Sequence, residues 1–222
     1  MKAAILVFPG SNCDRDLAVA FARAGFDVAM VWHKETALPP GTDVVGVPGG
    51  FSFGDYLRCG AIAARSPVAA ALARHAEAGG YVLAPCNGFQ ILTEMGLLPG
   101  ALLRNAGLKY VCARVRLRVE AADTAFTSRW SHGQVVTLPI AHHEGNYVAD
   151  ADTLTRLRDE DRVALRYERA PNGSTDRIAG VLSANRRVLG LMPHPERACE
   201  IDHGNTEGAA VFRGLAEALV AA

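Results

Sequence analysis

The sequence predicts a single α/β domain, with an open, twisted, mainly parallel sheet in three layers and helices on both faces. Two observations lead to this prediction. The first third of the chain alternates short apolar runs with amphipathic helical segments, which is the spacing of right-handed βαβ units. The 222 residues are 50% hydrophobic and 21% charged, as is typical of a globular domain. Residues 1–222 are therefore expected to form one domain.

The first half is expected to contain buried strands joined by helices. Short apolar runs bounded by turn residues predict strands at residues 3–8, 27–32, 44–47 and 81–84. Ser11 and Asn12 offer N-cap oxygens to a helix that ends near Gly25. An alanine-rich segment closed by two glycines predicts another helix over residues 61–78.

The second half is expected to add antiparallel strands. Residues 110–120 alternate apolar and polar side chains, which predicts a strand exposed on one face. Further strand patterns occupy residues 135–141, 162–167, 178–183 and 188–192. The last two flank residues 184–187, which predict a hairpin turn. An amphipathic helix over residues 205–220 is expected to close the chain.

Composition excludes several classes of function. Lys plus Arg and Asp plus Glu both number 23, so the basic excess of a nucleic-acid-binding protein is missing. No apolar run approaches the roughly 18 residues of a membrane span, and the run at residues 3–8 is too short for an export signal. We therefore expect a cytoplasmic protein. Its five cysteines lack CxxC spacing, which argues against disulfides and a structural metal site.

A candidate nucleophile, Cys86, follows the fourth predicted strand and precedes a helix. A nucleophile on such a turn is exposed at the carboxyl edge of the sheet, and the helix N-terminus favours its thiolate. Gly88 lets the helix approach closely. Ala84 stands where the usual elbow has glycine, so a core cysteine remains the alternative. Cys13 also follows a strand and begins a helix, which makes it the rival nucleophile.

A candidate base lies at the end of a later strand, in the segment His194-Pro195-Glu196. In an extended chain residues i and i+2 point the same way, so Glu196 can accept a hydrogen bond from the His194 ring. His194 can then act as a base toward a thiol across the sheet edge. A surface pair is the alternative. Gly49-Gly50 follows the third strand, and N–H groups there and at Asn87 can form an oxyanion hole; a simple glycine turn is the alternative.

Several of these segments resemble a known family. Residues 86–90 (CNGFQ) and 194–196 (HPE) resemble the class I (triad) glutamine amidotransferases, which have a flavodoxin-like fold. Residues 8–14, 48–60, 140–147 and 171–174 are similar, more narrowly, to the glutaminase subunits of phosphoribosylformylglycinamidine synthases of purine biosynthesis. The resemblance covers essentially the whole chain. The sequence departs from the family pattern at Ala84-Pro85, where Gly-Ile is usual, and at His143, where glycine is usual.

The resemblance implies a reaction and a partner. Cys86 would attack the side-chain amide of L-glutamine, with the oxyanion held by N–H groups of Gly50 and Asn87. His194, oriented by Glu196, would protonate the departing ammonia and then activate water. Gln90 would help to bind the amino-acid end of glutamine.

The ammonia would pass to a large ATP-dependent synthase subunit that acts with a small accessory subunit and converts formylglycinamide ribonucleotide to the amidine. ATP and Mg are expected on that partner, since this chain has no GxxxxGK[ST] phosphate loop. No cofactor is implied in the chain itself. Residues 55–58 and 142–147 are candidates for the contact surface.

Two other classes of function remain open. The chain can be a related cysteine hydrolase or an amidotransferase that serves another acceptor, or a catalytically silent interaction module. The complete triad of residue types argues against the silent module. The long segment around Asp55 lies outside the triad and argues against a different hydrolase.

Overall fold

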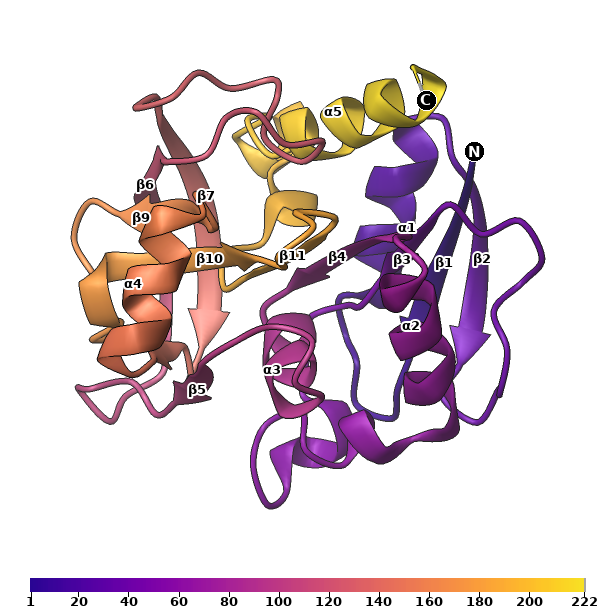
Figure 1. Cartoon of the computed structure of the whole chain (residues 1–222), viewed down its shortest axis with the longest axis horizontal. Coiled ribbons are helices and arrows are strands. Elements are labelled where there is room, and N and C mark those ends of the chain that lie inside the picture. Colours follow the sequence, from indigo (N-terminus) through magenta and orange to yellow (C-terminus); the bar gives the residue numbers. More distant parts are fainter. Residues whose placement is uncertain (222) are drawn as a thin grey trace.

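A nine-stranded sheet forms the centre of the computed structural model, which describes residues 1–221 (Figure 1). Its strand order is β2-β1-β3-β4-β11-β10-β9-β6-β7. The bounds of these strands are β1 (Lys2–Val7), β2 (Asp27–Trp32), β3 (Val44–Gly46), β4 (Tyr81–Pro85), β6 (Val111–Val119), β7 (Val135–His142), β9 (Val163–Tyr167), β10 (Ile178–Leu182) and β11 (Val188–Leu191).

The sheet is parallel in one half and antiparallel in the other. Strands β2, β1, β3, β4 and β11 pair in parallel, whereas β10, β9, β6 and β7 continue the sheet by antiparallel pairs. The predicted antiparallel strands of the second half are therefore confirmed. So is the predicted hairpin, because β10 and β11 are consecutive antiparallel neighbours.

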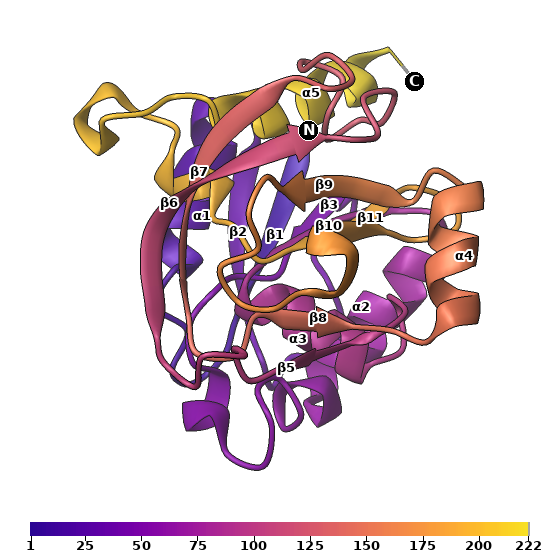
Figure 2. The ribbon, with the colours of Figure 1, turned by 90° about the vertical axis from the view of Figure 1, so that its left-hand side faces the viewer.

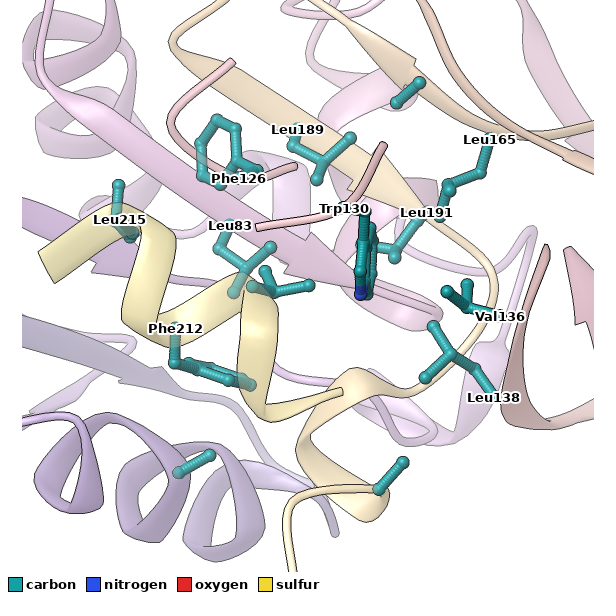
Figure 3. Packing of buried hydrophobic residues seen from close by; sticks show 14 of the residues in the cluster. Leu83, Phe126, Trp130, Val136, Leu138, Leu165, Leu189, Leu191, Phe212 and Leu215 are labelled. Carbon is teal, nitrogen blue, oxygen red and sulfur yellow. The ribbon is translucent and has the colours of Figure 1, made fainter. Parts of the chain in front are cut away.

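Helices cover both faces of the sheet, as predicted. Their bounds are α1 (Asp14–Arg23), α2 (Pro67–Glu77), α3 (Asn87–Glu94), α4 (Ala151–Asp159) and α5 (Ala209–Val220). Ile5 of β1 belongs to the buried cluster that contains Phe21 of α1 and Phe212 of α5. Leu6, the next residue along β1, belongs instead to the cluster that contains Leu72 of α2. Figure 3 shows side chains from α5 packed against those of β4 and β11 in the first cluster.

The helix boundaries correct three predictions. The N-cap of α1 is Cys13 and makes no side-chain capping bond, so the caps predicted at Ser11 and Asn12 are wrong. The helix predicted over residues 61–78 begins at Pro67, because proline lacks an N–H and holds the preceding Ser66 extended. Residues 63–65 form a separate 3-10 turn. The last helix begins at Ala209 rather than at residue 205, where the Asn205 side chain binds the β7 backbone.

The sequence did not predict three elements, which are two short strands and the helix α4. Strands β5 (Ala101–Leu103) and β8 (Asn146–Val148) form a small antiparallel sheet. Helix α4 follows β8, and Figure 2 shows both beside the antiparallel half. The Asp150 side chain caps α4 by accepting a hydrogen bond from the Thr153 N–H at 2.7 Å. No helix within residues 1–221 is long and apolar enough to cross a membrane.

The turn from β4 into α3 depends on a glycine, as predicted. A Cβ atom at Gly88 would lie 2.1 Å from the Val47 carbonyl oxygen. Only glycine therefore lets α3 start so close to the end of β3, which brings the first residues of α3 beside the loop that follows β3.

We expect Gly88→Ala to destabilise the fold by about 2 kcal/mol, because the new methyl group meets backbone that cannot rotate away. Chemical unfolding monitored by circular dichroism measures this change. Gly107→Ala is the matched control, since nothing lies within 4 Å of a Cβ there. Equal stabilities of the two variants would contradict the close approach.

Candidate active site

Cys86 occupies a sharp elbow between β4 and α3. Its backbone has φ 50° and ψ −109°, a conformation that L-residues rarely adopt and that strains the backbone. The elbow is held on both sides, because the Cys86 N–H donates to the Leu191 carbonyl at 2.7 Å and its own carbonyl accepts from Gln90. The thiol lines a cavity and is 5% exposed. The predicted turn from strand to helix is confirmed, but the predicted exposure of Cys86 is wrong, because the residue is buried.

His194 and Glu196 follow β11 and form the pair that the sequence predicts. The His194 Nδ1 donates to Glu196 Oε1 at 2.6 Å, and both side chains are buried. The backbone differs from the prediction, because residues Pro195–Arg197 form a 3-10 turn instead of an extended chain. Within the described residues, the His194 Nε2 has no hydrogen-bond partner. The pair therefore leaves the second ring nitrogen available for chemistry.

The surroundings of His194 favour its protonated form. Burial opposes the charge, but Glu196 and Cys86 outweigh it and raise the pKa of His194 well above its ordinary value. The Cys86 contribution to this pKa is the charge of its thiolate near the ring. The tertiary structure thus brings the three predicted triad residues together.

Cys13, the rival nucleophile, also lies beside this pair. Ligand atoms of Cys13, His194 and Glu196 all lie within 4.8 Å of one another, so they are candidates to hold a metal ion. Burial raises the pKa of the Cys13 thiol, and this thiol donates to the Asn12 side chain. Cys86 lies on the strained elbow and lines the cavity, whereas Cys13 is not among the lining residues.

A cavity of about 210 Å³ opens beside the Cys86 thiol. It lies at the carboxyl edge of the parallel strands, where α/β proteins place their ligands. The loop after β3, the start of α3 and the loop after β7 supply its walls. The lining residues are Gly50, Phe51, Asp55, Cys59, Cys86, Gln90, Arg104, Ala141, His142, His143 and Glu144.

Two of the three predicted oxyanion and substrate residues, Gly50 and Gln90, line this cavity, and Asn87 directly follows the lining residue Cys86. Gly50 lines the cavity with φ 135°, and a Cβ there would collide with the Asn12 backbone. Asn87 begins α3, and its buried side chain accepts from the Ser52 N–H and donates to Gln90 Oε1 at 2.8 Å. Gln90 Nε2 donates to the Glu144 carbonyl at 2.6 Å. Both ends of the Gln90 amide are therefore engaged within the protein.

The sequence placed His142 in a candidate contact surface, residues 142–147. The structure corrects this, because His142 is 3% exposed and lines the same cavity, and Tyr147 is also buried. The Asn105 Nδ2 donates to two backbone carbonyls, so the amide oxygen Oδ1 is the atom that faces the His142 ring. The His142 Nδ1 therefore donates to Asn105 Oδ1 at 3.1 Å. Its Nε2 is a buried acceptor without a partner in the described part of the chain. Burial and the charge of His194 lower the pKa of His142 to about 4. The ring is therefore neutral at physiological pH.

A buried polar network holds the His142 loop in place. Asn105 Oδ1 accepts from the Gly145 N–H, while Asn172 and Ser174 both donate to the Gly145 carbonyl. Ser174 also accepts from the Tyr147 N–H. Residues 171–174, which match the family pattern, therefore help to hold the loop that contains Gly145.

Comparison with known proteins decides the family. Residues 1–208 match the family described as CobB/CobQ-like glutamine amidotransferase domain. The chain is 72% identical over 215 residues to phosphoribosylformylglycinamidine synthase subunit PurQ of Cereibacter sphaeroides, covering 97% of each. It is 64% identical over 222 residues to that subunit of Ruegeria pomeroyi, covering 100% of each. The chain belongs to the PurQ family.

Solved structures agree with this membership. The PurQ-family chain superposes on the structure of PurLQS from Thermotoga maritima with a TM-score of 0.91 and 45% identity, covering 98% of both chains. A glutaminase domain of Trypanosoma brucei CTPS with bound acivicin has a TM-score of 0.65 at 14% identity and covers 98% of this chain and 94% of the other, which shows a shared fold. The family resemblance drawn from the sequence is confirmed.

The depressed pKa of His142 predicts acid sensitivity. Because the unfolded chain takes up this proton near pH 6.5 and the folded chain only near pH 4, the wild type should lose about 2 kcal/mol of stability through this residue between pH 7 and pH 5. His142→Gln should lack that loss. Urea unfolding of both proteins at the two pH values measures the difference, and a parallel decline of both contradicts the assignment.

Proposed function

We propose that residues 1–222 form one glutaminase domain that hydrolyses L-glutamine with Cys86, His194 and Glu196. The observation that carries the proposal is the His194–Glu196 pair. Among the described residues its Nε2 has no hydrogen-bond partner, and the charge of Cys86 acts on the same ring. Such a set serves as nucleophile, base and orienting carboxylate. Membership of the PurQ family supports the substrate, the enzymatic activity and the place in purine biosynthesis.

The reaction proceeds in two halves. The Cys86 sulfur attacks the amide carbon of glutamine and forms a tetrahedral intermediate, whose oxyanion accepts hydrogen bonds from N–H groups of Gly50 and Asn87. Protonated His194 gives its proton to the nitrogen, and ammonia leaves as the thioester forms. His194 then takes a proton from water, which attacks the thioester and releases glutamate and the Cys86 thiol. No metal or cofactor enters these steps.

We propose that the ammonia passes to a large PurL-type synthase subunit that acts with a small PurS-type subunit in the cytoplasm. The 45% identical relative was solved as PurLQS, which supports such an assembly. The loop after β3 suits the contact, because Tyr56 is 74% and Leu57 is 88% exposed next to the cavity-lining Asp55. Large exposed apolar side chains on a structured loop are typical of interaction surfaces.

Assays of the reconstituted synthase complex can distinguish glutamine hydrolysis from amidine synthesis. Cys86→Ala should lower glutamine-dependent amidine formation by several orders of magnitude, because no other group replaces the covalent nucleophile. Synthesis from added ammonium salt should persist, since the synthase does not use this thiol. Cys13→Ala is the matched control and should retain most glutaminase activity. Glutaminase activity of Cys86→Ala within tenfold of wild type would instead favour Cys13.

The two remaining triad residues should differ in importance. His194→Asn should be nearly inactive, because His194 moves a proton in each half-reaction. Glu196→Gln should be less damaged, since Glu196 orients and stabilises the ring without transferring a proton. Steady-state glutamate formation by folded variants ranks them. The reverse order would show that the roles are exchanged.

A further inference from the structure

A buried thiol lies beside the triad histidine, outside the cavity next to Cys86. Cys13, His194 and Glu196 each offer one ligand atom, and these three atoms all lie within 4.8 Å of one another. All three side chains are buried, and none of them lines that cavity. The triad chemistry uses His194 and Glu196 but gives the Cys13 thiol no role.

The space around Gly49 shows which edge of the histidine ring the thiol approaches. A Cβ atom at Gly49 would lie 3.2 Å from the Cys13 Sγ, 3.3 Å from the His194 Nδ1 and 2.7 Å from the His194 Cε1. The thiol therefore lies beside the ring edge that carries Nδ1, the nitrogen that donates to Glu196 Oε1 at 2.6 Å. The Cys13 N–H donates to the Gly49 carbonyl at 3.3 Å, so a backbone hydrogen bond holds the thiol there.

The three donors suit a zinc ion. Thiolate, imidazole and carboxylate ligands bind Zn²⁺ at roughly 2.0 to 2.3 Å in a tetrahedron, which places their donor atoms about 3.5 Å apart. The His194–Glu196 pair would open by about 1 Å and the Cys13 Sγ would move inward by a similar amount to reach this geometry. Water can take the fourth position. Mg²⁺ and Ca²⁺ prefer oxygen ligands, so the thiol and the ring select against them.

The cluster contains a buried acceptor that a cation can use. The Glu196 Oε2 has no hydrogen-bond partner among residues 1–221. A carboxylate and a thiolate removed from water are costly unless positive charge lies beside them. Arg197 is near Cys13, but its Nε donates to Asp16 at 2.8 Å and so its charge is shared with a carboxylate outside the cluster. A divalent cation would supply the missing charge.

We propose that Cys13, His194 and Glu196 bind Zn²⁺ and that the bound ion inhibits glutamine hydrolysis. This inference rests on the proposed function, because it describes how the same triad is switched off. The ion displaces the thiol proton of Cys13 and the Nδ1 proton of His194, and both protons pass to solvent. The ring then keeps its remaining proton on Nε2, while Glu196 binds the metal instead of orienting the ring. His194 can no longer take a proton from water at that nitrogen.

Zinc titration of the reconstituted synthase complex tests the proposal. Glutamate formation is measured with increasing ZnCl₂ for the wild type, for Cys13→Ala and for Cys112→Ala, a control that removes an exposed thiol. Cys13→Ala should raise the zinc concentration for half-inhibition by about 100-fold, because loss of even an outer partner of a metal ligand costs 10- to 100-fold in affinity. Cys112→Ala should leave it unchanged. Ammonium-dependent synthesis at the same zinc concentrations separates inhibition of the partner from inhibition of this chain.

Cobalt binding to the purified chain gives a readout that does not depend on activity. Co²⁺ occupies zinc sites, and a thiolate ligand gives it a charge-transfer absorption band. We expect this band in the wild type and in Cys86→Ala, and its loss in Cys13→Ala.

The proposal is overturned if the wild type shows neither the band nor zinc inhibition, or if Cys13→Ala keeps either of them. Loss of the band in Cys86→Ala would also overturn it, since the metal would then bind the catalytic thiol. Failure of the proposed function looks different, because the wild-type complex would release no glutamate even without zinc, while the cobalt band would persist.

Discussion

The parallel pairing of β4 with β11 is the constraint on which the site depends. These strands are distant in the sequence, yet they lie side by side with Leu191 opposite Pro85. The hydrogen bond from the Cys86 N–H to the Leu191 carbonyl fixes the elbow against the end of β11. Because both strands end at the same edge, the nucleophile and the His194–Glu196 pair emerge together. A change in this register would separate them.

The antiparallel half contributes the substrate side of the cavity. β7 places Ala141 and His142 opposite the elbow, and buried side chains from two other segments clamp the loop that follows. Such a network makes the loop rigid only while every member is satisfied. Among the described residues, His142 Nε2 is one of the buried polar atoms without a hydrogen-bond partner, and His142 lines the cavity. A ligand with a hydrogen-bond donor could therefore pair with the His142 ring.

Strain is concentrated where the chemistry occurs. Positive φ angles occur at Cys86 and Asp55, which line the cavity, and at Phe53 and Leu57 in the same loop as Asp55. Non-glycine residues adopt such angles only when their surroundings hold them. At Cys86 the holding groups are backbone hydrogen bonds on either side. Along the loop after β3, Asp55 turns toward the cavity while Tyr56 and Leu57 are exposed. One strained loop therefore borders both the substrate site and the proposed partner surface.

The sequence alone determined the strands of the nine-stranded sheet, the elbow and the residue types of the triad, because periodicity and strand-to-helix turns are local properties of the chain. It misjudged helix starts at Pro67 and Ala209, where a proline and a long-range contact of Asn205 override the local pattern. Only the tertiary structure placed Asp55, His142 and Glu144 in one cavity and engaged Gln90 within the protein. Hydrogen bonds and burial between distant segments decide these placements, and no local pattern records which side chain a distant segment will meet.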